Sequence, residues 1–387
     1  WKGYYNSSGN NLQLAIKAAM ASNPVNNNAI AQCKIVLAEL MYEATTLYGD
    51  IPYTEAWNAS FPYPKYDKQQ DVLENVLKLL DEGSAQFDES NPNLIISDYD
   101  LFYNGKIASW KKLANSLKFR TLMLMVDADP SKAAAIGALL AHPENMIASA
   151  SEAWKFPYGK DASMNNPKYR LINELNGGDN NLFLANKAVI DYMLPKNDPR
   201  IPQYFEPGAD GKYRGVGTDQ EANENTSYIS SYLQRADAPD LLCSYQELLL
   251  LQAEAYARGI GVTKDLNKAQ ALYKQGLTEA MNFYEADPAA IETYMTTQLA
   301  DLTKIADPAK EIHLQQWIDL MDRPLEGFTQ WRTSGPEGKE VPALTLPPNS
   351  PNGPLIRRWG YAPDENSANP NIPKPAPLYS DKMWFDL

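Results

Sequence analysis

Apolar residues recur every three to four positions in two separate parts of the chain, and this spacing predicts amphipathic helices. In the first part the predicted helices cover residues 29–48, 69–87, 106–127 and 131–141. In the second part they cover 240–258 and 265–285, with weaker patterns at 288–303 and 308–322. Local chemistry agrees, because Gly49 ends the first helix and Pro52 prevents its continuation. We therefore expect an all-α body at residues about 29–141 and 240–332.

The pattern changes between these parts, where residues about 144–238 are rich in polar side chains, glycine and proline. So long a stretch is unlike a structureless loop in a compact domain, so we expect an ordered, irregular insertion that carries function. After residue 333 the chain is proline-rich, with eleven of its 28 prolines at 336–377. Proline interrupts helices, so residues about 333–387 are predicted to be non-helical, ordered coil. Together these parts predict a single domain over residues 1–387.

Two neighbouring predicted helices carry a repeat-like pattern. Ala269, Tyr273, Gly276 and Leu277 have the spacing of the second helix of a tetratricopeptide repeat. One repeat cannot bury its apolar face alone, so further pairs are required, and the helices at 29–48 and 69–87 are a candidate. The alternative is a generic αα-hairpin, which this pattern does not exclude.

Charge and composition narrow the classes of function. The chain has 387 residues and a formal net charge of −13, and a negative surface repels phosphate, so nucleic acid is not an expected partner. No apolar run approaches the roughly 20 residues that span a bilayer. Cys33 and Cys243 both lie in helical patterns and are predicted to be buried thiols, with a disulfide between them as the alternative.

The sequence carries no constellation typical of catalysis. The metalloprotease, nucleophile-elbow and phosphate-loop motifs are missing, and Ser109 and Lys112 match a nucleophile motif whose companions are absent. His142 and His313 are isolated and are read as surface or core residues. The Asx and glycine cluster at 176–181 is typical of a turn rather than a calcium site. We expect no catalytic residue, metal or cofactor.

Several motifs follow one another along the chain. They are Leu47-Tyr-Gly-Asp-Ile-Pro-Tyr-Thr-Glu-Ala-Trp57, Tyr103-Asn-Gly-Lys106, Trp110-Lys-Lys-Leu-Ala-Asn-Ser-Leu-Lys-Phe-Arg120, Asn197-Asp-Pro-Arg-Ile201, Ala253-Glu-Ala-Tyr-Ala-Arg-Gly259, Trp331-Arg-Thr-Ser-Gly335, Tyr361-Ala-Pro-Asp-Glu-Asn366 and Lys382-Met-Trp-Phe-Asp386. In kind and order they resemble the SusD/RagB family of outer-membrane nutrient-binding lipoproteins, and more closely its SusD-like subgroup. The Trp331 motif departs from the family's usual double arginine before Thr-Gly.

The resemblance implies a fold and a role. The fold would be all-α, with tetratricopeptide-like helix pairs in a right-handed superhelical body and a large irregular, loop-rich lobe. The protein would lie on the extracellular face of a Bacteroidota-type outer membrane, held by a lipid on a cysteine upstream of Trp1. Its expected partners are an oligosaccharide and a SusC-like TonB-dependent transporter, to which it would deliver nutrients.

Two loop regions combine the side chains that bind sugars, because aromatic rings stack on sugar C–H faces while amides bond the hydroxyls. The candidate ligand-binding residues are Trp57, Tyr63, Trp154, Tyr158, Asn165 and Asn166. We therefore predict a glycan-binding protein that is not an enzyme. The alternatives are a tetratricopeptide scaffold for protein partners, the same uptake role with peptide cargo, and a hydrolase.

Overall fold

The computed structural model describes residues 1–91, 94, 96–178, 183–218, 220–344, 346 and 355–386. The predicted turn at 176–181 lies partly outside these residues. The chain forms two compact units, each assembled from separate stretches. The first contains Trp1–Ala148, Phe328–Glu340 and Pro354–Leu387, and the second contains Ser149–Gly327 and Val341–Gly353. The predicted division into body, insertion and tail within one domain stays a prediction.

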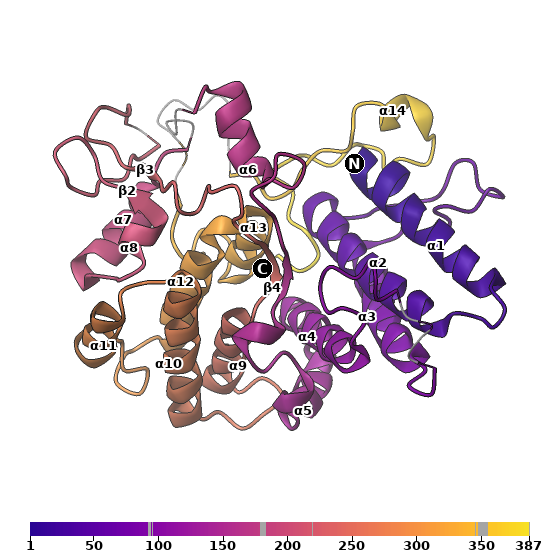
Figure 1. The fold of residues 1–387 in the computed structure, drawn as a ribbon, viewed down its shortest axis with the longest axis horizontal. Coiled ribbons are helices and arrows are strands. Elements are labelled where there is room, and N and C mark those ends of the chain that lie inside the picture. The colour runs from indigo at the N-terminus through magenta and orange to yellow at the C-terminus, as the bar shows by residue number, and fades with distance from the viewer. Residues whose placement is uncertain are drawn as a thin grey trace. The chain divides into compact units, whose positions relative to one another are not determined.

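The first unit is a stack of antiparallel helices (Figure 1). Its elements are η1 (Gly3–Gly9), α1 (Asn10–Ala21), α2 (Asn27–Tyr48), α3 (Gln69–Gln86), α4 (Ile107–Met125), η3 (Pro130–Lys132), α5 (Ala133–Leu140), η4 (Pro143–Asn145) and α14 (Glu365–Ala368). The Asn26 side chain starts α2 by accepting the Ala29 amide at 3.0 Å. Apolar residues of α2, α3 and α4 form the core, including Ile35, Leu73 and Leu113, which are fully buried.

The second unit holds the other helices and four short strands. The helices are η5 (Ala150–Glu152), α6 (Pro167–Arg170), η6 (Leu171–Leu175), α7 (Lys187–Met193), η7 (Leu194–Lys196), α8 (Ile201–Tyr204), α9 (Tyr245–Arg258), α10 (Leu266–Phe283), α11 (Pro288–Thr297), α12 (Pro308–Asp319) and η8 (Leu320–Asp322). The strands form two antiparallel pairs, β1 (Trp154–Phe156) with β4 (Asp240–Cys243) and β2 (Phe205–Glu206) with β3 (Tyr228–Ile229). The boundary between units falls within α13 (Pro324–Thr333).

The helix pair α9 and α10 confirms the repeat-like prediction. Ser244 and Glu247 form a capping box that starts α9, and left-handed Gly259 ends it. At Gly276 the helices come so close that a Cβ would lie 3.1 Å from the Leu250 side chain. Buried Ala269, Tyr273 and Leu277 join the same apolar core. The small residues of the repeat pattern therefore allow this helix pair to pack closely.

The all-α prediction is confirmed, and most predicted helices match the structure within a few residues. The weak pattern at 288–303 gives a helix that ends at Thr297. The prediction of a non-helical tail was wrong at one point, because residues 365–368 form the short helix α14 between prolines. Cys33 and Cys243 are free and buried, as predicted. His313 is a satisfied core residue, 3.0 Å from the Glu254 carboxylate.

Candidate functional site

The site is built on the loop at residues 50–67, which links α2 to α3. Ile51 and Asp67 pair their backbones at its base, at 2.9 and 3.2 Å. The Asp67 carboxylate also accepts the amides of Tyr53 at 3.0 Å and Thr54 at 2.7 Å. One acidic side chain therefore satisfies the turn that follows the Tyr-Gly-Asp-Ile-Pro-Tyr motif, so the rest of the loop projects from a fixed base.

Trp57 lies in this loop with a φ of 57°, an uncommon conformation for a bulky side chain. Its indole nitrogen donates to the Tyr5 carbonyl at 2.9 Å, and its ring stacks on the Tyr5 ring with centroids 5.6 Å apart. A Cβ at Gly9 would overlap the indole, so the absence of a side chain there makes room for the ring. Trp57 is thus held half-buried in one orientation.

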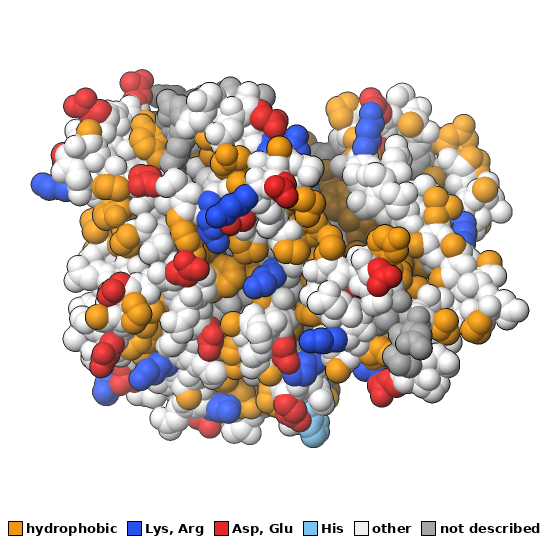
Figure 2. Space-filling model, viewed as in Figure 1, with side chains coloured by type: hydrophobic (Ala, Val, Ile, Leu, Met, Phe, Trp, Pro, Cys, Tyr) orange, Lys and Arg blue, Asp and Glu red, His pale blue; other side chains and the backbone are white. Residues whose placement is uncertain are grey.

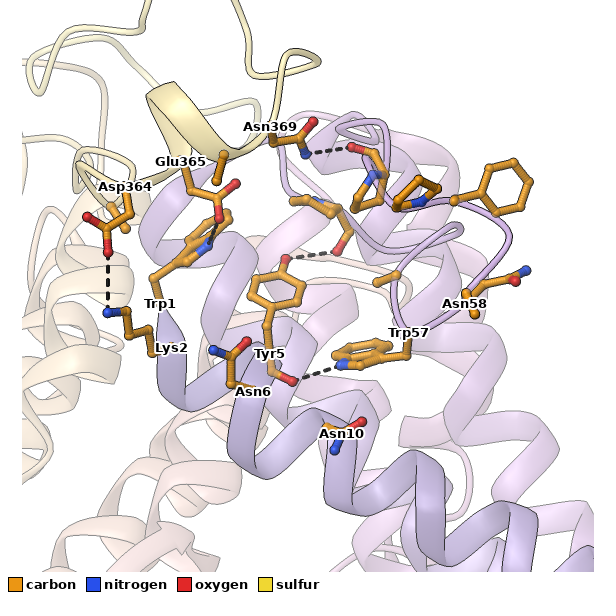
Figure 3. Close-up of a pocket in the computed structure, with 18 residues that line it drawn as sticks. Trp1, Lys2, Tyr5, Asn6, Asn10, Trp57, Asn58, Asp364, Glu365 and Asn369 are labelled. Carbon is orange, nitrogen blue, oxygen red and sulfur yellow. Dashed lines mark hydrogen bonds and ion pairs between the residues drawn. The ribbon is translucent and has the colours of Figure 1, made fainter.

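The N-terminal helical segment forms one wall of the site. Residues four apart lie on one side of a helix, so this segment presents two neighbouring rows. The first row packs toward the loop and contains Trp1, Tyr5 and Gly9. The second row is polar and contains Lys2, Asn6 and Asn10 (Figure 3). The wall therefore combines an aromatic row with a row of amides and one cation.

The C-terminal segment holds the loop from the other side. The Tyr361 hydroxyl donates to the Asp50 carbonyl at 2.7 Å. The Asn369 amide donates to the Pro64 carbonyl at 2.8 Å, and Asn371 donates to the Tyr63 carbonyl at 2.6 Å. These contacts bring together segments about 300 residues apart in sequence, and they fix both ends of the loop.

Glu365 at the start of α14 joins the two walls. Its carboxylate accepts the Trp1 indole N–H at 2.9 Å and the Tyr66 hydroxyl at 2.8 Å. The Trp1 and Tyr66 rings stack with their planes 15° apart. Burial, together with the hydrogen bond that the phenol donates to Glu365, raises the pKa of Tyr66 above its ordinary value, so the phenol keeps its proton. Glu365 therefore orients two aromatic rings at once.

These segments enclose a groove of about 760 Å³. Its lining combines aromatic rings, prolines and side-chain amides with three charged groups (Figure 3). The lining residues are Trp1, Lys2, Tyr5, Asn6, Asn10, Pro52, Ala56, Trp57, Asn58, Ala59, Phe61, Pro62, Pro64, Ala362, Asp364, Glu365, Ala368 and Asn369. Such a lining offers flat apolar faces beside hydrogen-bonding groups, the arrangement that sugar rings require.

Of the two residues predicted in this loop, Trp57 lines the groove. Tyr63 lies next to it, 55% exposed, between the lining residues Pro62 and Pro64. The sequence reasoning missed Tyr5, Asn6, Asn10 and Glu365. The signal that was available for Glu365 was its place in the Tyr-x-Pro-x-Glu-Asn motif.

The other four predicted residues lie in the second unit. Trp154 is buried in β1, 2% exposed, and Asn166 is 1% exposed. The Asn166 amide donates to the Ala238 carbonyl at 2.8 Å, and its oxygen accepts the Lys168 amide at 2.8 Å.

Tyr158 and Asn165 are half-buried. Tyr158 packs on the Phe156 ring, with centroids 4.8 Å apart. With its nitrogen as donor, the Asn165 amide bonds the carbonyls of Asp161 at 2.8 Å and Gly159 at 2.9 Å. These side-chain groups are engaged within their own segment, and whether any of the four contacts a ligand stays a prediction.

A second groove of about 710 Å³ lies along α7 and the loop at 211–220. It contains the ring of Tyr213, but its rim is charged. Lys187 pairs with Asp191, and Arg214 binds Asp210 through two hydrogen bonds of 2.7 and 2.8 Å. Tyr213 is the one aromatic residue among the described lining residues of this groove, whereas Trp1, Tyr5, Trp57 and Phe61 line the groove of the first unit, which is therefore the better candidate site.

The exposed surface of the first unit also carries single apolar side chains. Leu14 and Met20 of α1 are 53% and 60% exposed, and hydrophobic side chains are scattered over this part of the space-filling view (Figure 2). Isolated apolar residues of this kind are normal on protein surfaces.

In the described part of the chain no helix is both long and apolar enough to cross a bilayer.

The chain was compared with family models, with curated proteins and with solved structures. A family model described as "Starch-binding associating with outer membrane", SusD-like, matches residues 1–361. No curated protein matches the chain.

Solved structures match over nearly the whole chain. A chitin-binding protein is 27% identical with a TM-score of 0.81, covering 100% of this chain and 87% of that one. A SusD homologue from Bacteroides uniformis is 23% identical with a TM-score of 0.79, covering 98% and 85%. A chitin-binding SusD homologue from Flavobacterium johnsoniae is 20% identical with a TM-score of 0.77, covering 100% and 86%. The last two similarities bear on the fold alone.

Proposed function

The chain belongs to the SusD-like family of outer-membrane-associated glycan-binding proteins, and from this premise we propose that it captures an oligosaccharide in the Trp57 groove without cleaving it. It then delivers the glycan to a SusC-like TonB-dependent transporter. In this proposal the protein is held on the extracellular face of the outer membrane by an N-terminal lipid. The family consists of binding proteins rather than enzymes, which supports capture without turnover.

The fixed orientation of Trp57 is the observation that carries the proposal. The indole is held in place by its hydrogen bond to Tyr5, in the space that the lack of a side chain at Gly9 leaves for it. Little conformational entropy is therefore lost when a sugar stacks on it. The amides of Asn6, Asn10 and Asn58 line the same groove and can bond hydroxyl or acetamido groups. A flat ring beside several amides supplies the stacking face and the hydrogen-bonding groups that a sugar ring uses.

The first experiment measures binding and turnover together. The purified chain is titrated calorimetrically with hexasaccharides of N-acetylglucosamine, glucose, xylose and mannose, and each mixture is then examined for shorter products. N-acetylglucosamine chains are included because two similar structures are chitin-binding proteins. We expect saturable binding of at least one chain and no shortening. Release of shorter products would mean that the protein is a hydrolase. If no hexasaccharide binds but an oligopeptide titrated in the same way does, the cargo is a peptide.

The Trp57→Ala variant then tests the groove. We expect it to weaken glycan binding by about tenfold, equivalent to about 1.4 kcal/mol, because the stacking surface is lost. Trp359→Ala is the matched control, since Trp359 is 45% exposed in the same unit but does not line the groove. Equal affinity of wild type and Trp57→Ala would exclude the groove as the binding site.

Delivery is tested in the native cells that produce the protein. Affinity purification of the tagged protein from detergent-solubilised outer membrane should recover a TonB-dependent barrel in a defined ratio. If the protein is recovered alone and still binds glycan, it captures glycans but does not deliver them to a transporter. Tight recovery of another protein, unaffected by Trp57→Ala, would favour the scaffold alternative.

A further inference from the structure

The charge of the groove carries information about which glycans it accepts. Among the lining residues the charged groups are one cation, Lys2, and two carboxylates, Asp364 and Glu365. Lys2 and Asp364 pair with each other at 3.2 Å, and both side chains are 75% exposed. Their pairing leaves Glu365 as the charge that a bound ligand would meet in the wall of the groove.

Glu365 has no cationic partner in its hydrogen bonds. Both oxygens accept from neutral donors, the Trp1 indole and the Tyr66 phenol. The indole N–H is a donor only, and an ionised carboxylate is an acceptor only, so this geometry uses the charged form without neutralising it. The Glu365 carboxylate therefore lies between the Trp1 and Tyr66 side chains.

The remaining polar groups of the groove are uncharged. Asn6 in η1 and Asn10 at the start of α1 lie four residues apart on the wall that faces the groove (Figure 3). Their amides can donate to or accept from hydroxyl and acetamido groups of successive sugars. Among the described lining residues, the one cationic side chain, that of Lys2, is paired with Asp364.

We propose that the groove selects uncharged oligosaccharides, and that Glu365 excludes chains bearing carboxylate or sulfate while it positions Trp1 and Tyr66. This inference rests on the proposed function of the groove. The net charge of −13 also repels anions, but that long-range repulsion is screened within about 8 Å at physiological salt. A charge that contacts the ligand is screened far less, so the two effects separate when the salt concentration is raised.

The experiment compares chains of equal length that differ in charge. Hexasaccharides of N-acetylglucosamine and of glucose are the uncharged probes, and hexasaccharides of hyaluronan and of galacturonate are the carboxylated probes. Each probe is titrated at 0.05 and at 0.5 M salt, where the electrostatic screening lengths are about 14 and about 4 Å. We expect every carboxylated probe to bind at least about tenfold more weakly than the best uncharged probe at both salt concentrations.

Three variants test which charged group causes the difference in affinity between the best uncharged probe and the carboxylated probes, called the affinity gap below. Glu365→Gln keeps an oxygen for the Trp1 indole and removes the charge, so the affinity gap should narrow to about threefold. Asp364→Asn, on the exposed neighbour, should change the affinity gap only at low salt. Lys2→Gln removes the cation that pairs with Asp364 at the surface, so it should widen the affinity gap, and its exposed position makes unfolding no concern. Circular dichroism verifies the fold of Glu365→Gln.

The outcomes distinguish the two proposals. If a carboxylated chain binds as tightly as the best uncharged chain, or if Glu365→Gln folds and leaves the affinity gap unchanged, the selection is wrong while glycan capture stands. If the affinity gap survives in Glu365→Gln but disappears at 0.5 M salt, net charge accounts for it and Glu365 does not. If no probe of either kind binds, the proposed function itself fails.

Discussion

The loop at residues 53–66 and the segment at residues 154–166 are similar in composition but differ in structural role. Both combine aromatic rings with asparagine, and both were predicted to bind a ligand. In the first, Trp57 lines a groove, and the asparagines that hold the loop come from the distant C-terminal segment. In the second, Trp154 and Asn166 are almost fully buried, and the Asn166 amide serves its own unit.

The difference shows that composition does not separate a binding surface from a core. An aromatic ring binds a ligand only if one face stays open, and an amide does so only if backbone groups have not already taken its hydrogen bonds. Asn166 serves as a helix N-cap and also bonds the backbone of residue 238. The backbone around each residue, rather than its type, therefore decides its role.

Trp154→Ala provides the largest test of this comparison. Removing a fully buried indole should lower the free energy of unfolding by about 3–5 kcal/mol, because a cavity remains in the second unit. Denaturant unfolding followed by circular dichroism measures the loss. Glycan affinity of the folded fraction should not change. A variant that stays stable but loses glycan binding would place the ligand at Trp154 and reverse the comparison.

Asn166→Ala should have a smaller effect of the same kind. Its two hydrogen bonds are lost and the Ala238 carbonyl is left buried without that donor, so we expect a loss of about 1–3 kcal/mol in unfolding free energy. The control is Asn58→Ala at the exposed groove rim, which should change stability by less than about 0.5 kcal/mol. Equal effects of the two variants in thermal unfolding would contradict this assignment.

Asn369→Ala gives the smallest expected effect and acts on the binding loop. Without its bond to the Pro64 carbonyl the loop is less ordered before binding, so glycan affinity should fall by about threefold. Calorimetry with the best uncharged hexasaccharide measures the change, and Asn366→Ala, exposed on the same short helix, is the control. Unchanged affinity in Asn369→Ala would mean that the C-terminal segment does not organise the loop.

The helical part of the fold could be predicted because its signals are local. Helices α2 and α10 combine a regular apolar face with a capping side chain or a terminating glycine, and α3 has the apolar face alone. The bounds of all three were predicted within a few residues. Helix α1 was missed although Leu12, Ile16 and Ala19 recur at helical spacing. Its apolar face is short, and Ala19 is the one residue of this helix that is buried.

The groove could be predicted only in part. Trp57 was found because it is an aromatic residue in a proline-rich loop, which is a local feature. The opposite walls depend on hydrogen bonds between residues far apart, such as Trp1 with Glu365 and Pro64 with Asn369. No periodicity or motif spacing specifies such a pairing, so the contribution of Glu365 became visible only in three dimensions.

The discontinuity of the first unit has a consequence during synthesis on the ribosome. The later parts of the first unit, Phe328–Glu340 and Pro354–Leu387, are translated after the whole stretch Ser149–Gly327. The early helices can pack as they emerge, yet Glu365, Asn369 and Asn371 reach the loop only once the second unit has been made. In a nascent chain the loop at 50–67 therefore lacks the hydrogen bonds that fix it until residues 361–371 have been translated.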